Sequence, residues 1–274
     1  MTTNITAILL LLSLLITSPL LFAQDPDQES EPAAPATSTA TGTEDLLDQQ
    51  VPNHEKIWLN STGGPQLAFY LNETSGKAYG GVLLIPDTNR HPATAGLLNS
   101  LRHSLARNHW HTLAIKVADA NDEQTQQLIT AGISQMNQRG IYNLAILGEG
   151  AGAAQALAYV ASTPASQLNQ NQSNQIRAVL LIDGSNQVPN SDLKVLAQLA
   201  EIKIPILDAF LSNNYQEQQQ AAKRKQAARR HMNKLYQQIR LPQVSNFDPK
   251  EDNRITKRIR GWLDNNVAGF MVDR

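Results

Sequence analysis

The chain has 274 residues, of which 41% are hydrophobic and 17% are charged, and these proportions suit one medium-sized globular domain with a substantial core. The formal net charge of -1 argues against electrostatic binding of nucleic acid by the whole chain. Cysteine is absent, which excludes a thiol nucleophile, a disulfide framework, a cysteine-ligated zinc and an acylated lipoprotein anchor.

The N-terminal segment has the pattern of a targeting sequence. Residues 7–23, AILLLLSLLITSPLLFA, form an uncharged apolar run that ends at Ala23, and polar residues follow. This favours a signal peptide over residues 1–23, cleaved near Ala23. The run is also close to the roughly 20 residues that a spanning helix needs, so an uncleaved inner-membrane anchor over residues 7–23 stays open. Either interpretation predicts a periplasmic or secreted body.

Residues 24–48 are dominated by Pro, Ala, Ser, Thr and acids. Such a stretch cannot bury enough apolar surface to offset its ordering entropy, so we expect a disordered linker. A single domain over residues 49–274 follows. Within it, the polar stretch SQLNQNQSNQ, residues 166–175, predicts a surface loop.

This domain alternates short apolar strands with helices. The pattern predicts strands at residues 56–60, 67–71, 80–86, 111–117, 143–147, 177–184, 204–210 and 235–242. Helices are predicted at residues 94–108 and 122–140, after the glycine turn at 148–152, at 191–202, in a basic segment from residue 216, and at 254–266. Continuous apolar strands separated by helices predict an α/β fold with a doubly wound, mostly parallel sheet.

The order of these elements, with a glycine turn after the third parallel strand, resembles the α/β-hydrolase fold. More narrowly, GGVLLIPDTNRHP, ILGEGAGA, LLIDG, IPILDAF and RIRGWL resemble a bacterial exported family catalogued as domain of unknown function 3530. The resemblance spans roughly residues 55–265. It implies a sheet of α/β-hydrolase type in a single domain, and it implies no particular reaction.

The residues needed for acyl transfer by this fold are missing from their expected places. Catalytic members carry serine within G-x-S-x-G, an acid after a later strand and a histidine after the last strand. Here Gly150 stands at the serine position, Asn214 lies near the acid position, and Asn246 stands at the histidine position. Glycine has no nucleophile and asparagine cannot act as a general base. Asp208 lies within a strand, where its side chain is expected to point into the sheet. The sequence therefore predicts a pseudoenzyme.

Polar residues that follow the predicted strand at 80–86 suggest a binding role for the edge of the sheet where the parallel strands end. Asp87, Arg90 and His91 are predicted to lie near the turn formed by Glu149, Gly150 and Ala151. Because ligands of such folds bind at the carboxyl ends of the strands, these six residues are candidates for binding a small polar or anionic ligand. The structural alternative is that Asp87 caps a turn, Arg90 pairs with a nearby acid, and Glu149 stabilises the start of the helix.

A dinucleotide site is a weaker alternative. Gly148, Gly150 and Ala153 satisfy G-x-G-x-x-G/A, and the next strand ends at Asp183. However, this acid comes about thirty residues later rather than about twenty, and the motif follows a middle strand. Close packing of the helix against its neighbours explains the glycines equally well.

The basic helix that begins near residue 216 has two interpretations. Its apolar residues at helical spacing, which we expect to face the body, are Ala221, Ala228, Met232 and Leu235. Its cations could form a solvated face or a contact with a membrane surface. The cations assigned to that contact are Lys223, Arg224, Arg229 and Arg230.

The sequence as a whole predicts an exported protein of α/β-hydrolase type without serine-hydrolase chemistry. We expect it to bind or scaffold at the cell envelope, with a small polar ligand or an envelope protein as partner and no nucleic acid, metal or cofactor. The alternatives are an envelope hydrolase with an unorthodox site around Asp87, His91 and Glu149, and a dinucleotide-binding protein.

Overall fold

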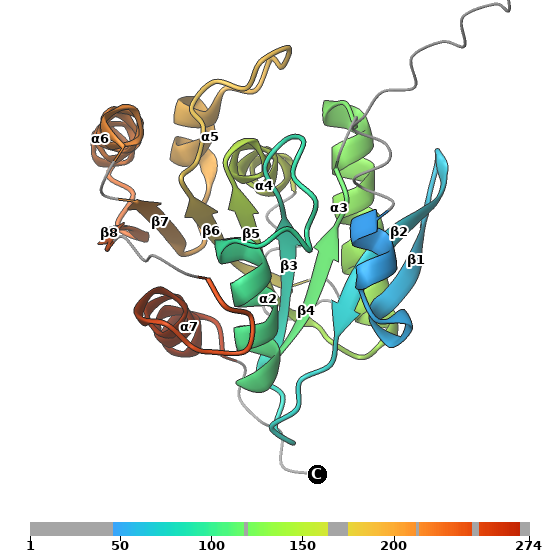
Figure 1. Ribbon diagram of the computed structural model, residues 1–274. Coiled ribbons are helices and arrows are strands. Elements are labelled where there is room, and N and C mark those ends of the chain that lie inside the picture. The colour runs from blue at the N-terminus through green and yellow to red at the C-terminus, as the bar shows by residue number, and fades with distance from the viewer. Residues whose placement is uncertain (1–45, 118–119, 164–174, 212–213, 243–246, 269–274) are drawn as a thin grey trace, which may run out of the picture. The chain divides into compact units, whose positions relative to one another are not determined.

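Eight strands form one twisted sheet in the order β1-β2-β4-β3-β5-β6-β7-β8 (Figure 1). They are β1 (Lys56–Ser61), β2 (Gly64–Leu71), β3 (Gly80–Ile85), β4 (Trp110–Ile115), β5 (Asn143–Glu149), β6 (Gln175–Ile182), β7 (Ile206–Leu211) and β8 (Tyr236–Leu241). Strand β2 runs antiparallel to both of its neighbours, β1 and β4, and the pairs from β4 to β8 are parallel. The prediction of a mostly parallel sheet is confirmed.

The computed structural model describes residues 46–117, 120–163, 175–211, 214–242 and 247–268, all of which belong to one compact unit. The expected signal peptide (1–23) lies outside the described residues. Most of the expected linker (24–48) does too, but residues 46–50 are helical. The Asp48 carboxylate accepts a bond from Lys116 Nζ at 2.7 Å, so the folded body begins a few residues earlier than expected.

Helices cover both faces of the sheet (Figure 1). One face carries α2 (Leu97–Arg107) and α7 (Arg254–Asn266). The other carries α3 (Asp122–Gln138), α4 (Ala151–Ser162), α5 (Val195–Glu201) and α6 (Tyr215–Arg230). A short 3-10 turn, Asn53–Glu55, precedes β1. Among the described residues, we found no helix that combines the length and the apolar character needed to cross a membrane.

The apolar strands are buried because each has a hydrophobic layer on both sides. Every residue of β3 is buried. Leu83 and Ile85 face the core under α3 and α4, whereas Val82 and Leu84 face the core under α2 and α7. Alternate side chains of one strand therefore enter different cores, and this is why continuous apolar runs, rather than alternating ones, mark these strands.

Helix α5 is shorter than the sequence indicates. We expected a helix over residues 191–202, but it begins at Val195. The Ser191 hydroxyl donates to Asp122 Oδ2 at 2.6 Å and accepts the Leu193 N–H at 3.3 Å. Such local side-chain bonds offer the backbone an alternative to the helix, so they delay its start.

The inward face of α6 also differs from the expectation. Ala221 and Ala228 are buried as predicted, but Met232 is 82% exposed and Leu235 is 46% exposed. The third inward position is filled by Arg224, which has no exposed surface. Its guanidinium forms two bonds of 2.9 Å with the carboxylate of Asp208 on β7. The prediction of Arg224 as a surface cation is therefore wrong, because a buried acid on the neighbouring strand neutralises it.

Candidate functional site

The candidate site lies at the carboxyl ends of the parallel strands, where β5 turns into α4. Gly150 occupies the turn with φ 56° and ψ -118°, a left-handed conformation that favours glycine. Its N–H donates to the Ile182 carbonyl at 2.9 Å, and its own carbonyl accepts the Ser185 N–H at 3.0 Å. The turn is thus fixed on both sides by the end of β6.

The Asp87 side chain fills the space in front of this turn. A Cβ atom added at Gly150 would lie 2.3 Å from both Cγ and Oδ1 of Asp87. Oδ1 also accepts the Ala151 N–H at 2.7 Å and the Thr88 N–H at 2.9 Å. In hydrolases of this type, the N–H after the nucleophile and an N–H from the loop after β3 hold the oxyanion. Here a carboxylate of the chain itself accepts N–H bonds of that kind.

Beside Asp87, Arg90 pairs with Glu149. Arg90 Nη1 and Glu149 Oε1 are 3.0 Å apart, with 42% and 14% of the two side chains exposed. Burial raises the pKa of Glu149, and the carboxylates of Asp87 and Asp183 add to this rise, whereas Arg90 opposes it. Ionising Glu149 in the folded chain therefore costs free energy, and the ion pair with Arg90 partly offsets this cost.

Glu149 should make folding less favourable as the pH rises. Its pKa is higher in the folded chain than the reference value of 4.5, so the folded state binds the proton more tightly than the unfolded state does. Stability due to this group is present at low pH and is lost as the pH rises through the folded pKa. We expect Glu149→Gln to gain stability relative to wild type as the pH rises through the range above 4.5.

Urea unfolding of both proteins across this pH range measures the difference. Glu251→Gln, at an exposed position, is the matched control. A Glu149→Gln difference that stays constant with pH, or that falls as the pH rises, would contradict the prediction.

His91 does not join this group. Its Nε2 atom lies 2.8 Å from Asp48 Oδ1, and its ring packs against Phe69 with centroids 5.2 Å apart. The side chain is 1% exposed. Of the six residues proposed from sequence, five lie together in the structure: Asp87, Arg90, Glu149, Gly150 and Ala151. The sixth, His91, instead contacts Asp48 in the helical residues 46–50.

The expected acid and base positions hold structural residues where they are described. Asn214 caps α6, with its Oδ1 accepting the Gln216 N–H at 3.0 Å. Asp208 is fully buried against Arg224, on the face of the sheet that α6 covers. Asn246 lies outside the described residues. Neither described residue can orient a catalytic histidine, because Asn214 is bonded to its own helix and Asp208 to Arg224.

Two further carboxylates lie at this edge, of which the sequence predicts Asp183 only as the acid of a dinucleotide site and does not mark Glu217 as a site residue. Asp183 directly follows β6 and accepts the Leu211 N–H at 2.7 Å, and Glu217 lies in the first turn of α6. Burial raises the pKa of both, and the charge of Asp183 raises that of Glu217 further. The signal was available, since an acid at the end of a parallel strand falls at the same edge as the turn after β5.

A cavity of about 290 Å³ opens next to the turn. Ala151 and Gly152 form one wall, and the segment Val188–Asn190 forms another. Side chains that bring polar groups to the lining are Thr88, Asn89, Asn121, Asp122, Thr125, Gln155 and Asn190. Amides and hydroxyls outnumber charges, so the lining suits a small, neutral, polar molecule.

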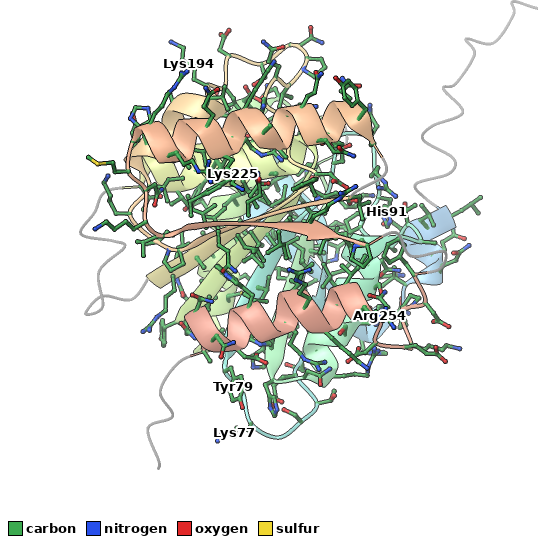
Figure 2. All side chains as sticks on the ribbon, turned by 90° about the vertical axis from the view of Figure 1, so that its left-hand side faces the viewer. Lys77, Tyr79, His91, Lys194, Lys225 and Arg254 are labelled. Atoms are coloured by element: carbon green, nitrogen blue, oxygen red, sulfur yellow. The ribbon has the colours of Figure 1, made fainter. Side chains whose placement is uncertain are left out.

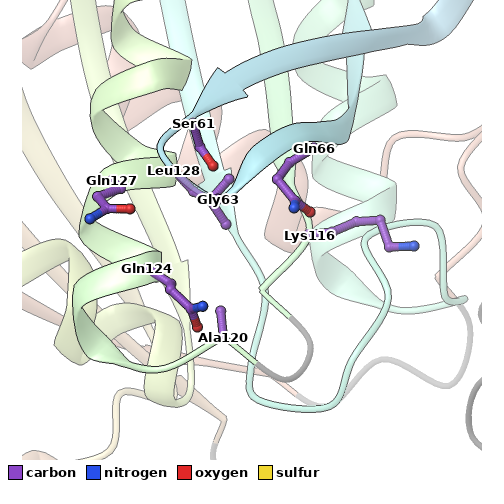
Figure 3. A pocket seen from close by; sticks show the side chains of 8 residues that line it. All are labelled: Ser61, Gly63, Gln66, Lys116, Ala120, Gln124, Gln127 and Leu128. Atoms are coloured by element: carbon purple, nitrogen blue, oxygen red, sulfur yellow. The ribbon is translucent and has the colours of Figure 1, made fainter.

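A second cavity, of about 220 Å³, lies away from the turn between the β1–β2 hairpin and α3 (Figure 3). Gln66 and Lys116 approach it from one side, and Gln124 and Gln127 approach it from α3. Lys116 is already paired with Asp48. The described residues hold no group of three or more His, Asp or Glu that could bind a metal ion, at either cavity or elsewhere.

The geometry does not suit a dinucleotide. A Cβ at Gly148 would lie 2.3 Å from the Gly152 carbonyl oxygen and 2.5 Å from the Ala153 Cα, so close helix packing requires this glycine. The N–H at the start of α4, where a pyrophosphate would bind, is bonded to Asp87. Steric packing therefore accounts for the glycines.

Comparison with protein families gave a match to the family described as "Protein of unknown function (DUF3530)" over residues 5–126 and 116–265. No curated protein matched the chain in sequence.

Solved structures with this fold include an esterase domain from Rhodothermus marinus, with TM-score 0.58, 12% identity, and coverage of 77% of this chain and 97% of that one. A putative dienelactone hydrolase from Klebsiella pneumoniae gives TM-score 0.56, 14% identity, and coverage of 77% and 95%. Est1E from Butyrivibrio proteoclasticus gives TM-score 0.58, 11% identity, and coverage of 77% and 98%. Likenesses at such identities establish the α/β-hydrolase fold alone.

Proposed function

The chain belongs to the DUF3530 family and has the α/β-hydrolase fold, and from this premise we propose that it is an exported binding protein without serine-hydrolase chemistry. In this proposal, the edge of the sheet that carries catalysis in hydrolases binds a ligand at the cell envelope. The ligand is a small polar molecule, held in the cavity of about 290 Å³ beside the turn.

The position of Asp87 is the observation that carries the proposal. Acyl transfer needs a nucleophile on the turn and free N–H donors for the oxyanion. At Gly150 a side chain would collide with the Asp87 carboxylate, and the Ala151 and Thr88 N–H groups already bond to it. A substrate oxyanion would have to displace a carboxylate held by two short bonds in order to reach these donors.

The cavity supports binding in two ways. Its volume is near the lower limit for small-molecule sites. It is also walled by fixed elements, because Gln155 donates to Asp122 and the Asn121 side chain caps α3. A polar molecule would therefore meet preorganised groups.

Wild type and Gly150→Ser should both stay unlabelled by a fluorophosphonate probe and should not turn over p-nitrophenyl acetate. The serine variant gains a hydroxyl, but no histidine of the sequence follows β8, the place from which the general base of this fold comes. A serine esterase assayed in parallel is the control. Labelling of either protein, or turnover by Gly150→Ser above wild type, would contradict the proposal that the protein lacks serine-hydrolase chemistry.

The binding half of the proposal is tested by native mass spectrometry of protein purified from the envelope fraction. Thr88→Trp places a large ring at an exposed position that lines the cavity, whereas Asn60→Trp is an exposed control on β1. A bound small molecule should accompany wild type and Asn60→Trp and be lost from Thr88→Trp. A ligand retained by Thr88→Trp would mean that the cavity is not its site.

One observation favours the alternative of a hydrolase with an unorthodox site. Burial raises the pKa of Glu149, as is typical of a general acid, and the residue lies beside Asp87 and Arg90. A panel of esters, amides and phosphoesters tests it. Hydrolysis by wild type that Glu149→Gln abolishes would support this alternative over the binding protein.

A further inference from the structure

The turn between α6 and β8 exposes two large apolar side chains. Met232 is 82% exposed and Leu235 is 46% exposed. Neither belongs to the hydrophobic clusters on the two faces of the sheet. They lie three residues apart at the tip of the turn, where water surrounds them.

Hydrogen bonds of the Asn233 backbone and side chain hold this turn. The Asn233 N–H donates to the Ala228 carbonyl at 2.9 Å, and Asn233 Nδ2 donates to the Leu199 carbonyl of α5 at 3.1 Å. The Leu235 N–H donates to Asn233 Oδ1 at 3.0 Å. Met232 has a φ of 50°, a left-handed conformation that is uncommon for a residue with a long side chain. Since Asn233 anchors the turn, Met232 and Leu235 are held outward and cannot relax into the core.

Exposed cations precede and follow the two apolar side chains along the chain. Between residues 225 and 234 they are Lys225, Arg229, Arg230 and Lys234. Within the described part of the chain, none of the four forms an ion pair. We call the six residues Lys225, Arg229, Arg230, Met232, Lys234 and Leu235 the α6–β8 patch.

We propose that the α6–β8 patch docks on an anionic lipid membrane. Its cations would pair with lipid head groups, while Met232 and Leu235 enter the boundary between head groups and acyl chains. Figure 2 shows α6, with Lys225, running along the side of the fold next to the β8 edge.

The shape of the patch favours a membrane over an acidic protein. None of its residues lines the cavity beside the turn or the cavity between the β1–β2 hairpin and α3. The apolar side chains protrude instead of lining a groove that a protein segment could fill. Protruding apolar side chains with exposed cations in the same segment suit a negatively charged membrane surface, where apolar side chains can enter between the head groups.

The patch is separate from the candidate site. It lies where α6 ends and β8 begins, whereas the turn at Gly150 lies where β5 ends and α4 begins. Strands β5 and β8 run in the same direction, so the start of β8 and the end of β5 lie at opposite ends of the strands. A docked protein would hold the candidate site away from the membrane, and failure of either proposal leaves the other standing.

Vesicle sedimentation tests the proposal. We would use the chain that begins at Gln24, which omits the apolar run of residues 7–23 and keeps the whole compact unit Thr39–Arg274. Vesicles with about one third phosphatidylglycerol should bind wild type at low salt and release it at high salt, because the screening length falls from about 30 Å at 0.01 M salt to about 3 Å at 1 M. Vesicles of phosphatidylcholine alone should bind far less.

Two groups of substitutions separate the contribution of charge to vesicle binding from the contribution of apolar side chains that enter the membrane. Replacing Lys225, Arg229, Arg230 and Lys234 with Gln should weaken binding about fivefold per cation, while Gln preserves the helix. Met232→Ser with Leu235→Ser should weaken it on the order of 100-fold. Matched controls are Trp58→Ser, which removes a side chain that is 63% exposed elsewhere, and Lys250→Gln with Lys257→Gln. Binding by the controls should stay within about twofold of wild type.

Two outcomes would overturn the proposal. Wild type that stays in the supernatant at low salt does not dock on membranes. Binding that falls with the cation variants but not with Met232→Ser and Leu235→Ser would be charge attraction without insertion, which an acidic partner could equally satisfy. Circular dichroism of each variant checks that the fold is retained.

Discussion

Replacing Arg224 with Met should lower the free energy of unfolding by about 3–5 kcal/mol, because it leaves the buried Asp208 carboxylate without its counter-ion. Both side chains have no exposed surface. The two bonds of 2.9 Å between them are parallel and bidentate, the geometry in which a guanidinium and a carboxylate interact best.

The rest of the Asp208 environment does not compensate for this loss. Asp208 also accepts bonds from the Tyr236 hydroxyl and from Gln238 Nε2. These donors are neutral, so they satisfy oxygen atoms without cancelling the charge. Burial and the Asp208 charge both raise the pKa of Tyr236, which therefore stays protonated and keeps donating.

Denaturant unfolding measures the effect. Arg230→Met is the matched control, since it makes the same change at an exposed position of the same helix and should stay within about 0.5 kcal/mol of wild type. Asp208→Asn with Arg224→Met removes both charges and should cost less than the sum of the single variants. Equal unfolding free energies for Arg224→Met and Arg230→Met would mean that Arg224 is not buried against Asp208.

Gly150→Ala should lower the free energy of unfolding by about 2–5 kcal/mol. Part of this is backbone strain, because a φ of 56° is unfavourable for a residue with Cβ by about 1–2 kcal/mol. The remainder is overlap with Asp87, whose Cγ would be 2.3 Å from the new Cβ, and overpacking costs about 1–3 kcal/mol. The carboxylate cannot move aside without losing its bonds to Ala151 and Thr88.

Two variants separate these contributions. Gly76 has a φ of 78° with nothing within 4 Å of an added Cβ, so Gly76→Ala measures strain alone. Asp87→Gly removes the obstacle, and the effect of Gly150→Ala in that background should fall toward the Gly76→Ala value. Additive effects of Asp87→Gly and Gly150→Ala would show that the two positions do not interact.

The strands of this fold could be predicted from sequence because each is an apolar run with a core on both sides. GGVLLIP and NLAIL were placed to within about two residues, which is the usual precision of an element boundary. The start of α5 could not be placed, because helical spacing gives no account of the bond from the Ser191 hydroxyl to Asp122.

The inward face of α6 was mispredicted for a related reason. Hydrophobic spacing assigns Met232 to the core and Arg224 to solvent, but Asp208, 16 residues earlier, reverses the assignment of Arg224. A signal did exist, since Asp208 is an acid inside the buried strand IPILDAF and needs a partner. Arg224 lies at helical spacing between Ala221 and Ala228.

The bond between Asp87 and the turn after β5 could not be predicted. It joins residues 64 positions apart, and it depends on the missing Cβ of Gly150 and on the path of the loop after β3. Sequence reasoning placed both groups at one edge of the sheet. It gave no way to know that Asp87 would bond to Ala151, while Arg90 would extend past it to Glu149.

Asp87 and Gly150 also constrain how such a chain can change over generations. A single-base change converts many glycine codons to serine codons, yet serine at position 150 meets the Asp87 carboxylate and loses stability before its hydroxyl can be of use. A change at Asp87 that comes first leaves the Ala151 and Thr88 N–H groups without their acceptor. Each step alone is unfavourable, so selection for stability keeps glycine in this turn.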